Sequence, residues 1–82
     1  MEQRHTLWHN RRAAIAALYV DYTGETAKAI QFTVVDNPRL SFWLPKKAVK
    51  FAEDNQATIA HWFPVTGFAL DMFERYGSHY SR

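Results

Sequence analysis

This chain of 82 residues has no cysteine, only three glycines and three prolines, and no long apolar run. Without cysteine it can form neither a disulfide scaffold nor a thiolate zinc site, and thiol catalysis is excluded. The longest uninterrupted apolar run, Ala13–Val20, is far shorter than the roughly 20 residues of a membrane-spanning helix. The polar segment Met1–Arg12 lacks the apolar stretch of a secretory signal. We therefore expect a cytoplasmic protein with no membrane partner.

The composition predicts one small folded domain. Apolar residues make up 48% of the chain, and the formal net charge is +2, which is typical of a globular protein. A chain of this length buries only about 60% of its unfolded surface, so it has room for a single core. We expect a polar N-terminal arm or short helix over residues 1–12 and a single α+β domain over residues 13–82.

Alternating apolar side chains predict several strands in the first three quarters of the chain. The predicted strands cover residues 13–22, 26–35, 40–44, 46–51 and 57–63. Gly24 lies in a short turn between the first two strands, which predicts a hairpin. Pro45 cannot donate a ladder hydrogen bond, so the third strand must end there or lie at an edge of the sheet.

An apolar stripe at helical spacing follows the strands. Its members are Val65, Phe68, Ala69, Met72, Phe73 and Tyr76. This stripe predicts a helix over residues 65–76, with Gly77 as its end. The fold class is therefore α+β, an antiparallel sheet of four to five strands with one C-terminal helix packed on one face. The phenylalanines expected in the core are Phe32, Phe42, Phe51, Phe68 and Phe73.

The residues that commonly carry chemistry form no recognisable site in this sequence. His5 and His9 would share one side of a helix, but two ligands are too few for a structural zinc ion. His61 alternates with Ile59 and Phe63, which favours a packed core histidine. The three serines and three glycines build neither a nucleophile elbow nor a phosphate-binding loop. We expect no enzymatic activity, no cofactor and no metal.

Aromatic residues are the unusual feature, at 16% of the chain. Strand alternation places Tyr19, Trp43 and Trp62 on the side of the sheet opposite the predicted core. Basic residues lie near them in the sequence: Arg39, Lys46, Lys47 and Lys50. Flat aromatic rings beside cations suit single-stranded nucleic acid, and tryptophan, tyrosine and arginine are equally enriched in protein-binding hot spots. A third interpretation is that the arm covers this face through Leu7 and Trp8.

Two short segments resemble a group of small phage- and plasmid-borne proteins. Glu25–Ile30 matches an "ETxKA" strand, and Phe42–Lys46 matches the start of a "WLPKS" strand, with Trp62 before a helix. Lys47 stands where that pattern has a serine, and the C-terminal helix is longer than is usual in the group. The resemblance spans residues 20–62. Because the group has no assigned activity, the resemblance implies an origin in a mobile genetic element more than a mechanism.

These patterns predict a binding protein that occupies the surface of a host protein or nucleoprotein complex, as an inhibitor of the anti-CRISPR kind or as an adaptor. The predicted contact residues are Tyr19, Arg39, Trp43, Lys46, Lys47 and Lys50. The alternative is a nucleic-acid-binding module that uses the same basic aromatic face, although a net charge of only +2 is small for strong nonspecific DNA binding. A second copy of the chain is a further candidate partner.

Overall fold

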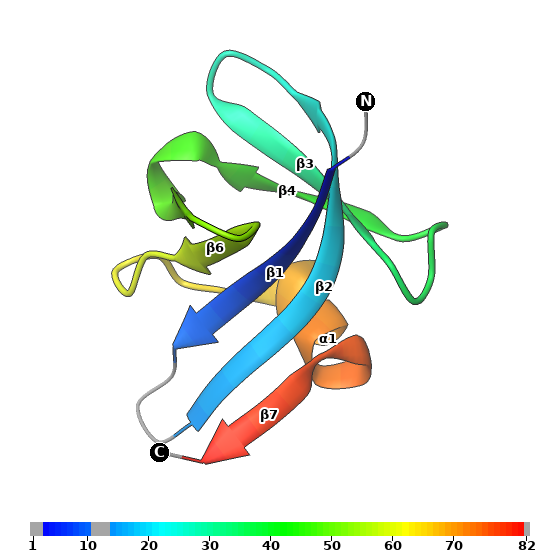
Figure 1. Ribbon diagram of the computed structural model, residues 1–82, viewed down its shortest axis with the longest axis vertical. Helices are drawn as coiled ribbons and strands as arrows, with labels where there is room; N and C mark the ends of the chain where they lie inside the picture. The colour runs from blue at the N-terminus through cyan, green and yellow to red at the C-terminus, as the bar shows by residue number, and fades with distance from the viewer. Residues whose placement is uncertain (1–2, 11–13, 82) are drawn as a thin grey trace.

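The computed structural model describes residues 3–10 and 14–81. In these ranges the chain forms one mixed seven-stranded sheet and one α-helix, so the fold is α+β (Figure 1). The elements in chain order are β1 (Gln3–Asn10), β2 (Ala14–Glu25), β3 (Ala29–Val34), β4 (Ser41–Pro45), the short 3₁₀ helix η1 (Lys46–Ala48), β5 (Val49–Ala52), β6 (Gln56–Ile59), α1 (Gly67–Tyr76) and β7 (Ser78–Ser81). No helix in the described ranges is long and apolar enough to cross a membrane.

The long strands β1 and β2 form the centre of the sheet. They pair antiparallel along the whole length of β1, and β1 pairs on its other edge with β6 in parallel. The second edge of β2 is shared between β7, beside its first residues, and β3, beside its last residues. The strand order is β4-β3-β2-β1-β6-β5. Because η1 joins the two outermost strands, β4 and β5, the sheet curls around its inner face (Figure 1).

The first segment of the chain corrects the sequence prediction most strongly. Residues expected to form an arm or short helix form the central strand β1, and residues 78–81, where no strand was predicted, form β7. The sheet therefore has more strands than expected, and the parallel pairing of β1 with β6 means that it is not purely antiparallel. Leu7 is completely buried and His5 is only 6% exposed, while Thr6 and Trp8 point to the other face. Inward-facing histidines hid the apolar alternation of this strand. The predicted boundary between residues 12 and 13 lies outside the described ranges.

The predicted fourth and fifth strands are shorter than the sequence suggested. Residues 46–48 form η1, and strand β5 begins only at Val49. The last predicted strand ends at Ile59, because the chain then turns, with the Phe63 amide donating to the Ala60 carbonyl at 3.0 Å. His61 therefore lies exposed in a turn and is not the packed histidine that we expected.

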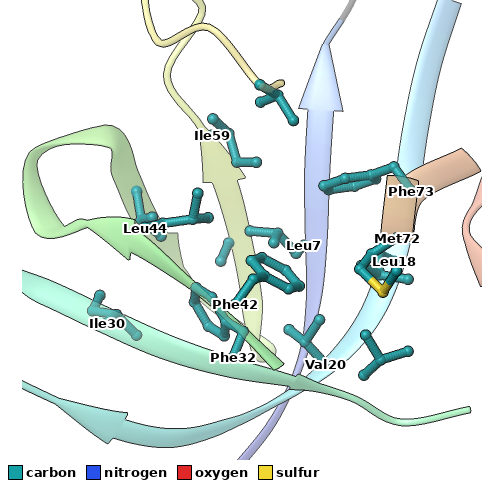
Figure 2. Close-up of a cluster of buried hydrophobic side chains, with 14 of the residues drawn as sticks. Leu7, Leu18, Val20, Ile30, Phe32, Phe42, Leu44, Ile59, Met72 and Phe73 are labelled. Atoms are coloured by element: carbon teal, nitrogen blue, oxygen red, sulfur yellow. The ribbon is translucent and has the colours of Figure 1, made fainter. Parts of the chain in front are cut away.

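The core lies between the curled sheet and α1 (Figure 2). Phe32, Phe42 and Phe73 are buried there as predicted. Phe51 and Phe68 were expected in the core, but 46% and 47% of their surfaces are exposed. The helix begins at Gly67 and not at residue 65. Phe68 consequently sits in its first turn, at the rim of the core.

Gly77 ends α1 as predicted, but the reason is close packing. Its φ of −82° is open to any residue. A Cβ at this position would lie 2.5 Å from the Phe73 carbonyl oxygen and 3.0 Å from the Ala17 carbonyl oxygen. Only glycine allows the chain to pass directly from the helix to β7 against the backbone of β2.

Candidate partner-binding site

Tyr19 and Trp43 both lie on the outer face of the sheet, as strand alternation predicted. Their exposed fractions are 56% and 50%. The interpretation in which an arm covers them is wrong, because Leu7 is in the core and Trp8 lies on the outer face of β1. The Trp8 indole Nε1 donates to Gln56 Oε1 at 2.6 Å, and its ring lies 6.0 Å from that of Tyr80.

The predicted contact residues do not gather into one patch. The register places Tyr19 two strands and four residue steps away from Trp43, or about 16 Å on a flat sheet. Arg39 is exposed in the turn before β4, and Lys47 is exposed in η1 directly after it. Lys50 is exposed on β5 in the row of Thr58 and Trp8. Thus Arg39, Trp43, Lys46 and Lys47 lie along the strand β4 and its two flanks, whereas Tyr19 and Lys50 lie on other strands.

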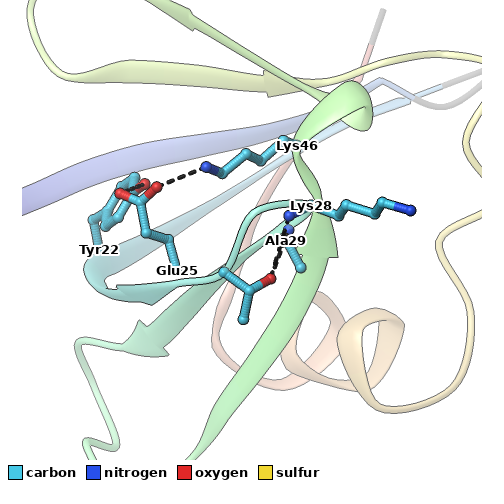
Figure 3. A network of polar contacts seen from close by, with 6 residues as sticks. Tyr22, Glu25, Lys28, Ala29 and Lys46 are labelled. Atoms are coloured by element: carbon cyan, nitrogen blue, oxygen red, sulfur yellow. Dashed lines mark hydrogen bonds and ion pairs between the residues drawn. The ribbon is translucent and has the colours of Figure 1, made fainter.

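Lys46 is occupied by an ion pair at the end of β4 (Figure 3). Its Nζ donates to Glu25 Oε2 at 2.6 Å, and the Tyr22 hydroxyl donates to Glu25 Oε1 at 2.8 Å. The bond from Lys46, followed by the bond from Tyr22, lowers the pKa of Glu25. The same carboxylate raises the pKa of Tyr22. The charge of Lys46 is therefore directed at Glu25, within the "ETxKA" segment, and its contribution to a basic face is reduced.

A groove of about 330 Å³, lined mainly by apolar residues, lies between β4 and the start of α1. β4 contributes Phe42, Trp43 and Leu44. The segment that leads into the helix contributes Phe63, Pro64, Thr66, Phe68 and Ala69. No charged side chain lines the groove, and two of its aromatic residues, Trp43 and Phe68, are about half exposed. We call this feature the Trp43–Phe68 groove.

The backbone near the groove explains why Phe68 faces it. Gly67 has a φ of +60°, a left-handed conformation that glycine adopts without strain. A Cβ at Gly67 would meet no atom within 4 Å. Glycine is therefore favoured there by its positive φ, and not by a lack of room for a side chain. The chain thus turns sharply into α1, and the helix buries Met72 and Phe73 while Phe68 stays at the surface.

The chain matches no protein-family model, and no curated protein or solved structure matches it. Within the described residues, no group of three or more His, Cys, Asp or Glu side chains lies close enough to hold a metal ion. What the geometry offers is a water-exposed apolar groove beside a tryptophan at the edge of the sheet. Tryptophan, like tyrosine and arginine, is enriched among the residues that contribute most to protein–protein binding.

Sequence reasoning identified Trp43 but missed Phe68. Trp43 is recognisable because strand alternation alone places it outside. Phe68 belongs to a regular apolar stripe, which is typical of a buried helix face. The nearest signal in the sequence is Pro64 with Gly67, which together allow a delayed helix start.

Proposed function

We propose that this protein is a non-enzymatic binding protein that occupies the surface of a partner protein through the Trp43–Phe68 groove. The observation that carries the proposal is the pairing of two half-exposed aromatic side chains across an uncharged groove. Leaving such apolar surface in water is unfavourable, and burial against a partner removes it. The resemblance to mobile-element proteins favours a host protein or nucleoprotein complex as the partner. The protein would act on this partner as an inhibitor or as an adaptor.

The test is capture of partners from a bacterial lysate by matched tryptophan variants. Trp43→Ala should lose the captured protein, because it removes one wall of the groove. Trp62→Ala is the control, since Trp62 is 58% exposed and does not line the groove. Both variants should keep the circular dichroism and melting curve of the parent, because exposed substitutions change stability by about 0.5 kcal/mol or less. Retained capture by Trp43→Ala, or equal loss in both variants, would contradict the proposed site.

The variant Tyr19→Ala tests whether the partner contacts the groove or the outer face of the sheet around Tyr19. Tyr19 is exposed but distant from β4 along the sheet. Capture that survives this substitution supports the groove as the contact site. Capture that is lost in Tyr19→Ala and retained in Trp43→Ala would instead place the contact around Tyr19 on the outer face.

Nucleic-acid binding has less support as the alternative function. Lys46 is paired with Glu25, Arg39 and Lys47 lie at opposite ends of β4, and Lys50 lies on β5. Fluorescence anisotropy with short single- and double-stranded oligonucleotides tests it directly. If a phosphate backbone binds, removing Lys46, Lys47 and Lys50 should flatten the salt dependence by about one unit of slope per lost contact. Absence of binding in low salt would eliminate this alternative.

A further inference from the structure

One edge of the strand β4 carries unpaired backbone groups. β4 pairs antiparallel with β3, and two backbone bonds set the phase of the pairing: the Val34 amide donates to the Leu40 carbonyl, and the Lys46 amide to the Lys28 carbonyl. Hydrogen-bonded pairs alternate with non-hydrogen-bonded pairs in such a ladder. Ser41 and Trp43 therefore belong to non-hydrogen-bonded pairs, and their amides and carbonyls point away from β3.

These groups have no backbone partner among the described residues. β4 is the last strand on its side of the sheet, and no turn or loop bond reaches Ser41 or Trp43. The edge presents two amide donors, while Pro45 contributes a carbonyl but no donor. The Trp43–Phe68 groove is lined by residues 42–44 of this same strand. An unpaired edge and an apolar groove thus share one strand.

We propose that the groove takes an extended acidic segment of a partner protein, which adds as a strand to the free edge of β4. This inference rests on the proposed function and specifies its partner. Strand addition supplies affinity through main-chain bonds and specificity through pockets for alternate side chains. The bonds would come from Ser41 and Trp43. Apolar side chains on one side of the added segment would enter the groove beside Phe68.

The acidic character of the partner segment follows from the charges at the two ends of β4. The strand itself, Ser41–Pro45, carries no charge. Arg39 is exposed just before it and Lys47 is exposed just after it. Neither is part of an ion pair found in the described residues. An added strand with acidic residues toward both ends would place one of them near Arg39 and another near Lys47. A basic segment would be repelled by both cations.

The same charges disfavour a second copy of this chain as the occupant. Two β4 edges pairing antiparallel about Trp43 would set Arg39 of each copy opposite Lys47 of the other copy. Like charges directly opposite one another destabilise a strand pair. Pro45 would also remove one donor from each side of that pairing, which is typical of edges protected against self-association.

The experiment uses a short capped peptide of alternating valine and threonine with two glutamates at each end. We expect binding that slows hydrogen exchange of the Ser41 and Trp43 amides by about tenfold or more, because both gain hydrogen bonds. A matched peptide with lysine in place of glutamate should bind about fivefold more weakly. A glutamate peptide with its central amides N-methylated should not protect either amide. Arg39→Ala combined with Lys47→Ala should abolish the preference for glutamate over lysine.

The outcomes separate this inference from the proposed function. Glutamate-peptide binding without protection of the two amides, or no binding at millimolar peptide, overturns strand addition. The proposed function still stands if Trp43→Ala loses its captured protein in the lysate experiment, and it falls if capture is retained. Equal binding of both peptides overturns the acidic partner. Protection of Ser41 and Trp43 without peptide, with a dimer in sedimentation, replaces the partner with a second copy.

Discussion

The β1–β2 pair and the strand β4 belong to one sheet but differ in what surrounds them. β1 has a strand on each edge, and β2 is flanked by β1 on one side and by β3 and β7 on the other. β4 has one paired edge, and beside its residues 42–44 lies an apolar groove. A buried, fully paired strand contributes to stability, whereas a half-paired strand beside an apolar groove leaves backbone groups and apolar surface exposed. We therefore expect substitutions at the centre to unfold the protein and substitutions around β4 to leave it folded.

The two helix phenylalanines provide the largest test of this difference. Phe73 is fully buried against the sheet, whereas Phe68 is 47% exposed at the groove. Phe73→Ala should lower the free energy of unfolding by about 3–5 kcal/mol, because it leaves a cavity in the core. Phe68→Ala should cost about 1 kcal/mol or less. Urea unfolding followed by circular dichroism measures both, and similar losses would contradict the separation of core and groove.

Leu7 tests whether β1 is a central strand. It is completely buried, and it lies between Leu18 of β2 and Ala57 of β6. Leu7→Ala should lower the free energy of unfolding by about 2–5 kcal/mol. The control is Arg4→Ala, because Arg4 is exposed on the same strand and its ion pair with Asp21 at 3.4 Å lies at the surface. A Leu7→Ala variant as stable as the control would mean that β1 does not pack in solution.

The two glycines that bracket the helix give a smaller effect for two different reasons. Gly77→Ala should lower the free energy of unfolding by about 1–3 kcal/mol, since its Cβ would collide with the Phe73 carbonyl oxygen. Gly67→Ala meets no atom but forces a non-glycine residue to a φ of +60°, at a cost of about 1–2 kcal/mol. Thermal melts of both variants test the comparison. Peptide binding should change only in Gly67→Ala, because Gly67 precedes Phe68 at the groove.

The smallest expected effect is the pH dependence contributed by Glu25. The bonds from Lys46 and Tyr22 lower the pKa of this carboxyl in the folded state. Its contribution to stability is therefore present above the ordinary carboxyl pKa of 4.5 and is lost as the pH falls through the lowered folded value. NMR titration should give a lower midpoint for Glu25 in the parent than in Lys46→Gln. An unchanged midpoint would mean that the ion pair does not persist in solution.

Several elements of the fold could be predicted because their patterns are local. β3 and β4 alternate strictly, so Phe32, Phe42 and Trp43 were assigned to the correct faces. The helix was expected from its stripe, with its start two residues too early. β1 was missed because His5 and His9 occupy inward positions that normally hold apolar residues. The parallel pairing of β1 with β6 joins residues 50 positions apart, and no local pattern reports such a contact.

The candidate site was predictable only in part for the same reason. Trp43 could be placed outside from alternation within its own strand. The groove needs β4 and the start of α1 to meet, and Phe68 lies 25 positions after Trp43. The predicted basic cluster failed to assemble because Lys46 pairs with Glu25 on β2, while Lys50 belongs to the opposite outer strand, β5. Short sequence distances between lysines did not translate into a shared surface.

The parallel contact between β1 and β6 also sets the order in which the chain can fold during synthesis. Thr6 pairs beside Gln56, so β1 is synthesised well before its neighbour exists. At roughly 5–20 residues per second, the delay is roughly 3–10 s. During that interval β1 can pair with β2, but its other edge has no partner and its inward face lacks the helix. The edge of β1 that takes β6 therefore stays without its native partner until the chain beyond residue 56 has been made.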